Sequence, residues 1–117
     1  MKSKTLLVAG LLAFARIGVA ADFEDGMAAY EEGRYVAAQA AFLAAARHGD
    51  GQAQEILGFM YAFGPQLYPG TTRDMEAART WFGQAGGKGR PVARYMYCTL
   101  SRGASPATLA SAKCLRD

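Results

Sequence analysis

The chain has 117 residues, of which 51% are hydrophobic and 20% are charged, with a formal net charge of +3. This length allows one domain rather than two, and the hydrophobic share argues against a disordered chain. The 14 glycines follow no three-residue period, which excludes a collagen-like repeat.

The N-terminus has the three-part organisation of a secretory signal peptide. A basic head precedes an apolar run over 5–15, and small residues then allow cleavage after Ala20 or Ala21. The apolar run is shorter than the roughly 20 residues that span a bilayer. We predict a signal peptide over 1–21 and a periplasmic or secreted domain over 22–117. An uncleaved N-terminal anchor helix is the alternative.

Cleavage would change the charge of the protein. The leader holds three basic residues and no acid, so ten basic and ten acidic residues would remain. A chain with a net charge of zero does not have the excess of basic residues that is typical of nucleic-acid-binding proteins. It also contains no run of like charges that would indicate a membrane-binding patch. We therefore expect no nucleic-acid partner and no stable membrane insertion after cleavage.

From Asp22 onward, apolar residues recur every three to four positions, which is typical of amphipathic helices. Short segments rich in glycine and proline interrupt this pattern. No stretch alternates with the period of a strand. The sequence predicts an all-α fold with helices over 23–32, 35–47, 51–63, 73–86, 91–102 and 106–115.

The chain also resembles itself when it is shifted by 40 positions. The matching pairs are Ala37 with Ala77, Ala38 with Ala78, Phe42 with Phe82, Ala45 with Ala85, Gly49 with Gly89 and Ala53 with Ala93. Self-similarity of this kind is typical of stacked helical hairpins, since one hairpin cannot bury its apolar stripe alone. We predict a short α-α solenoid of about two and a half to three helical hairpins.

Two of the predicted helices carry small and aromatic residues at fixed spacing. The first has Gly49, Ala53, Leu57, Gly58, Tyr61 and Gly64, and the second has Asp74, Ala77, Ala78, Trp81, Phe82, Ala85 and Gly89. Together they resemble a Sel-one-like repeat of the tetratricopeptide-like superfamily. Residues 26–49 resemble a preceding tetratricopeptide-like half, and residues 89–117 resemble a degenerate closing repeat. The chain departs from the pattern in a longer loop over 64–72 and in Cys98 and Ser101, which replace a glycine and a tyrosine.

The resemblance implies a non-catalytic module that binds another protein or a peptide, as an adaptor or regulator in the bacterial cell envelope. It leaves two alternatives: an exported, cysteine-containing relative that binds or cleaves lactams, and a structural subunit that forms a homo-oligomer. The residues themselves favour binding over catalysis, because the sole imidazole, His48, lies at a helix end without a neighbouring nucleophile. We expect no enzyme, cofactor or metal site.

Cys98 and Cys114 are the only cysteines, and they lie on the last two predicted helices. If residues 103–105 turn the chain, the two side chains face each other. Export would place them in an oxidising compartment, so we expect a disulfide that closes a loop of about 15 residues and contributes roughly 3 kcal/mol. The alternative is a pair of buried free thiols.

First helices of such repeats line the inner surface of the solenoid. On that basis the expected binding groove contains Glu55, Phe59, Phe63, Tyr95 and Thr99. The alternative is that the two phenylalanines pack under the long loop.

The loop 65–70 places Leu67 and Tyr68 between two prolines. These residues either form a stiff aromatic contact loop or fold back on the helices. We include both among the candidate binding residues.

Overall fold

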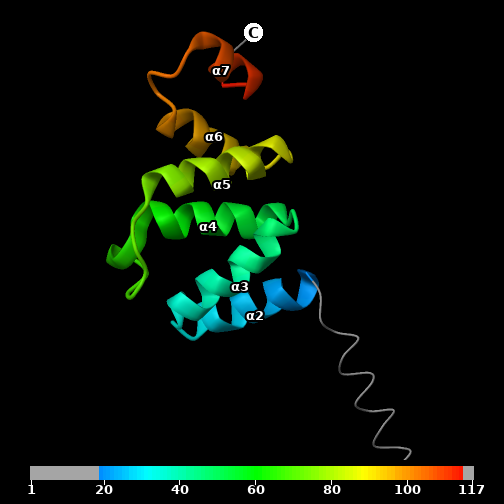
Figure 1. The fold of residues 1–117 in the computed structure, drawn as a ribbon, viewed down its shortest axis with the longest axis vertical. Helices are drawn as coiled ribbons and strands as arrows, with labels where there is room; N and C mark the ends of the chain where they lie inside the picture. The colour runs from blue at the N-terminus through cyan, green and yellow to red at the C-terminus, as the bar shows by residue number, and fades with distance from the viewer. Residues whose placement is uncertain (1–18, 115–117) are drawn as a thin grey trace, which may run out of the picture.

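The computed structural model describes residues 19–114, and within this range it contains helices and no strand. The elements are α2 (Val19–Glu31), α3 (Tyr35–Arg47), α4 (Gly51–Phe63), the 3-10 helix η1 (Gly64–Gln66), α5 (Met75–Gly87), α6 (Pro91–Leu100) and α7 (Pro106–Ser111). They follow one another along the molecule in chain order, and α4 and α5 lie side by side (Figure 1). The all-α prediction is confirmed. All but the end of the predicted signal peptide lies outside the described residues.

The predicted bounds of the helices over 35–47 and 51–63 are those that the structure has. The predicted last helix is too long, because it ends at Ser111 rather than near residue 115. Lys113 has a φ of 57°, which an α-helix cannot accommodate. A 3-10 turn occupies 64–66, where only an irregular loop was expected.

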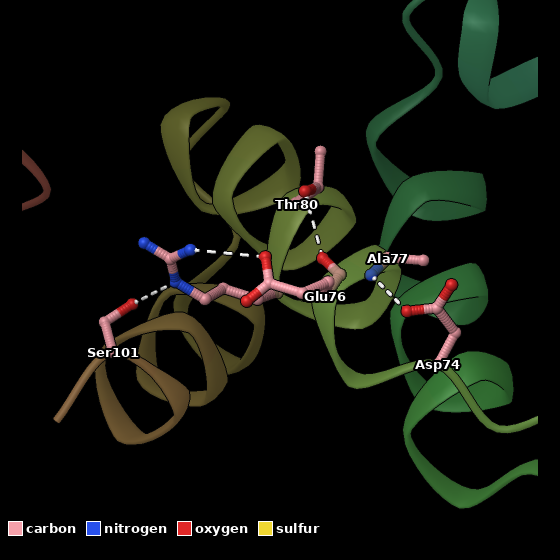
Figure 2. Close-up of polar contacts among 6 residues, drawn as sticks. Asp74, Glu76, Ala77, Thr80 and Ser101 are labelled. Carbon is pink, nitrogen blue, oxygen red and sulfur yellow. Dashed lines mark hydrogen bonds and ion pairs between the residues drawn. The ribbon is translucent and has the colours of Figure 1, made fainter.

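Capping side chains explain why α4 and α5 begin where they do. Asp50 accepts a hydrogen bond from the Ala53 backbone N–H at 2.9 Å at the start of α4. Asp74 does the same for the Ala77 N–H at 3.0 Å at the start of α5 (Figure 2). Such caps satisfy backbone donors that the first helical turn leaves unpaired.

Two buried clusters form the core, and a completely buried phenylalanine, Phe42 or Phe82, lies in each. Each ring faces a glycine of the neighbouring helix. A Cβ added to Gly26 would lie 2.7 Å from the Phe42 ring, and one added to Gly58 would lie 2.5 Å from the Phe82 ring. The missing side chains let the helix backbones approach closely enough for the rings to fill the space between them.

Arg79 of α5 ties that helix to the end of α6. Its Nε donates a hydrogen bond to the Ser101 Oγ at 3.0 Å (Figure 2), and its guanidinium lies 5.5 Å from the centroid of the Tyr97 ring. Ser101 is buried. The residue that departs from the repeat pattern therefore accepts a hydrogen bond in the interface between α5 and α6.

The short helix α7 has no buried residue of its own. Cys98 on α6 and Cys114 after α7 are paired as a disulfide, with their Cα atoms 5.4 Å apart. Their placement agrees with the predicted pairing. Since α7 buries so little, this bond is the main link that holds it against α6.

Candidate binding hollow

An apolar hollow of about 160 Å³ lies between α2, α4 and the loop that follows η1. Its lining residues are Met27, Tyr30, Ile56, Phe59 and Tyr68. None of these side chains carries a formal charge. The hollow can therefore take an apolar group, with the tyrosines as its polar components.

Phe59 is held in the wall of the hollow by two other rings. It meets the buried Phe82 edge-on, with ring centroids 4.9 Å apart, and it stacks on Phe63 at 6.3 Å. Phe63 is 40% exposed. Aromatic pairs with these geometries stabilise one another, so the wall is preformed.

The long loop divides its two candidate residues between the core and the surface. Tyr68 folds inward and is only 9% exposed, whereas Leu67 is 54% exposed. The Tyr68 hydroxyl lies 3.3 Å from the Tyr30 hydroxyl, and its ring centroid lies 5.3 Å from that of Tyr35. Tyr68 is thus a wall of the hollow, and Leu67 remains outside it.

Burial, followed by the Tyr30 hydrogen bond and the neighbouring tyrosines, raises the pKa of Tyr68 well above its ordinary value of 10.0. The folded protein therefore disfavours the phenolate. This contribution to stability is complete below pH 10.0 and is lost as the pH rises through the folded-state pKa.

We expect wild type to lose more stability than Tyr68→Phe as the pH is raised through the titration range of tyrosine, because the variant has no hydroxyl to ionise there. Denaturant unfolding at a series of alkaline pH values measures this difference. Absorbance at the phenolate band follows the tyrosines directly. Parallel stability curves for the two proteins would contradict the prediction.

Glu55 faces α6 rather than the hollow. Its Oε1 accepts a hydrogen bond from the Arg90 guanidinium at 2.9 Å, and its Oε2 accepts one from the Ala93 N–H at 3.1 Å. Arg90, the N-cap residue of α6, makes no side-chain capping bond. Glu55 of α4 therefore caps α6, which sequence spacing alone does not reveal.

Glu55→Ala is expected to lower the free energy of unfolding by about 1–2 kcal/mol, through loss of a cap and of a charged partner for Arg90. The exposed Glu24 of α2 is the matched control, and Glu24→Ala should change stability by less than about 0.5 kcal/mol. Urea unfolding of both variants makes the comparison. Equal losses would show that Glu55 acts only as a surface charge.

Tyr95 and Thr99, both on α6, do not line the hollow. Tyr95 is 68% exposed, and the Thr99 hydroxyl donates to the backbone oxygen of Tyr95. Of the seven candidate binding residues, the structure brings Phe59 and Tyr68 together in the hollow, with Phe63 beside Phe59.

Sequence reasoning missed three lining residues: Met27, Tyr30 and Ile56. All three belong to apolar stripes of the kind that predict a helix core. Their half-buried state depends on how α2 and α4 are spaced, and no sequence signal distinguishes it from full burial.

The residues that the structure describes were compared with the requirements of a metal site and of a membrane span. No group of three His, Cys, Asp or Glu side chains is placed to hold a metal, and His48 is exposed at the end of α3. No described helix is long and apolar enough to cross a membrane.

No protein-family profile, no curated protein and no solved structure matches this chain. The likeness to Sel-one-like repeats therefore stays a prediction.

The charge of the chain is unevenly distributed. Residues 22–76 carry nine acidic and three basic side chains. This segment includes α4 and nearly all of α2, so the hollow lies in an acidic half of the molecule. The balanced total charge conceals this asymmetry.

Proposed function

We propose that this protein is a non-catalytic binding module of the bacterial cell envelope, which holds an apolar and basic segment of another envelope protein. The observation that carries the proposal is the preformed apolar hollow between α2 and α4, open in an acidic half of the chain. An apolar side chain of the partner would enter the hollow, and its basic neighbours would be attracted by the net negative charge of residues 22–76.

The size of the hollow supports peptide binding rather than an enzyme pocket. Its 160 Å³ is below the roughly 300–1,000 Å³ typical of small-molecule sites. A space of this size suits one anchoring side chain, with the rest of the partner outside it. The stacked and partly exposed Phe63 provides further apolar surface beside it.

The architecture we propose is an exported, Sel-one-like α-solenoid. The support for it is that α3 and α5 bury equivalent residues, namely Ala38, Phe42 and Ala45 in one helix and Ala78, Phe82 and Ala85 in the other. The Cys98–Cys114 pair is compatible with an oxidising compartment.

The test is selection of binding peptides from a random library displayed on phage, with the full chain as target. We expect the selected peptides to share an apolar anchor flanked by Lys or Arg, and to bind more weakly as salt is raised. Failure to select any saturably binding peptide, or selection of acidic ones, would overturn the proposal.

Two arginine substitutions locate the binding surface. Met27→Arg places a cation in the hollow and should weaken peptide binding by about tenfold or more. Val92→Arg is the matched control, because Val92 is 52% exposed on α6 and does not line the hollow. Helical circular dichroism verifies that both variants fold. If the two weaken binding equally, the hollow is not the peptide site.

A further inference from the structure

The C-terminal helices have the opposite charge to the half that holds the hollow. Within the described range, residues 77–114 carry six basic side chains and no acidic one. A long segment without any carboxylate produces a positive potential that favours anions near its surface.

A second cavity, of about 320 Å³, lies within this basic half, where the end of α5 meets α6 and the segment after α7. Its lining includes Arg94 and Tyr97 of α6, Ser111 and Lys113 at the end of α7, and glycines of the α5 terminus. No acidic residue belongs to this lining. The volume is at the lower end of the range for small-molecule sites, so the ligand would be small.

Glycines keep the cavity open. A Cβ added to Gly87 or to Gly89 would meet no atom within 4 Å, so that space is empty. Two carbonyl groups at the α5 terminus accept hydrogen bonds: the Ala85 oxygen accepts from the Lys88 and Arg90 N–H groups, and the Gly86 oxygen accepts from the Gly89 N–H. Arg94 and Lys113 are the two charged side chains of the lining, and both are cationic.

We propose that this cavity binds a small molecule through an oxyanion group, a carboxylate or a phosphate, with Arg94 and Lys113 as its charged ligands. Among the described residues neither side chain makes an ion pair or a side-chain hydrogen bond, so both can bind an anion without losing a partner. A guanidinium matches the two oxygens of such a group, and an ammonium adds a compact second charge.

The disulfide joins the two sides of the cavity, which are α6 with Arg94 and Tyr97 and the segment after α7 with Lys113. Tyr97 directly precedes Cys98, and Lys113 directly precedes Cys114. Since α7 has no buried residue, reduction would release the Lys113 wall while α6 keeps the Arg94 wall in place. We therefore expect binding to depend on the oxidised pair.

The test is titration of the full chain with citrate and, separately, with inorganic phosphate, followed by the amide NMR signals of Gly86, Gly87 and Gly89. Saturable shifts are expected, and the tighter of the two probes distinguishes a carboxylate site from a phosphate site. Arg94→Gln and Lys113→Gln should each weaken binding by about tenfold. Gly87→Leu should abolish it by filling the cavity.

Arg102→Gln is the matched control, because Arg102 is an exposed cation of the same half that does not line the cavity. It should change affinity by less than about twofold. If it weakens binding as much as Arg94→Gln, the anion responds only to diffuse positive charge and the proposal is wrong. Binding that persists unchanged after reduction, or no saturable shift with either probe, would also overturn it.

Discussion

Replacing Gly64 with alanine is expected to lower the free energy of unfolding by about 3–5 kcal/mol. Gly64 ends α4 with a φ of 56°, which L-residues with a side chain rarely adopt. An added Cβ would also lie 2.6–2.8 Å from the Cβ, Cα and backbone N of Arg73. Arg73 cannot move freely, because its Nε donates to the Ala62 oxygen and the next residue, Asp74, donates its N–H to the Tyr61 oxygen.

Gly33→Ala separates the two causes of the lower free energy of unfolding, namely the positive φ and the contact of the new Cβ with Arg73. Gly33 has a φ of 76°, yet an added Cβ would meet nothing within 4 Å. This variant should therefore show backbone strain alone, about 1 kcal/mol. Guanidinium unfolding of the two variants measures the difference. Equal losses at Gly33 and Gly64 would mean that the contact with Arg73 relaxes without effect.

Gly58→Ala is expected to lower the free energy of unfolding by about 3 kcal/mol, near the upper end for an overpacked core. The new methyl group would lie 2.5–2.8 Å from the Phe82 ring, which is completely buried. Displacement of Phe82 would also disturb Phe59, whose ring packs edge-on against it. The substitution should therefore weaken peptide binding in the hollow as well as stability.

The control for Gly58 is Gly87→Ala. Gly87 is also helical, but its added Cβ would meet nothing, so the variant should be unchanged or more stable by about 0.5–1 kcal/mol. A Phe82→Leu change should cost less in the Gly58→Ala background than in wild type, with a coupling of about 1–2 kcal/mol. Additive effects in this double-mutant cycle would show that the ring and the glycine are not in tight contact.

The two proposed sites lie in halves of opposite charge, and this separates their ligands. The hollow between α2 and α4 favours an apolar segment with cations, whereas the cavity beside α7 favours an anion. Each site can therefore be disabled while the other remains, by Met27→Arg for the hollow and by Arg94→Gln for the cavity. Loss of both activities in either variant would indicate a folding defect.

The sequence by itself determined the helices and most of their buried faces. The apolar period placed the helices over 35–47 and 51–63 correctly. Glycine and proline ended or began several helices, and Asp50 and Asp74 cap α4 and α5, because these signals act within a few residues along the chain. The 40-residue self-similarity also indicated that Phe42 and Phe82 are equivalent residues. Both are completely buried, which agrees with a place in the core.

Only the tertiary structure decided what the site residues contact. It turned Tyr68 inward and left Leu67 exposed, and it directed the Glu55 carboxylate to the start of α6. It also brought Met27 of α2 and Ile56 of α4 together around one hollow. These outcomes depend on the distances and angles between helices. Gly26 and Gly58 contribute to that packing, because they let α2 approach Phe42 of α3 and let α4 approach Phe82 of α5.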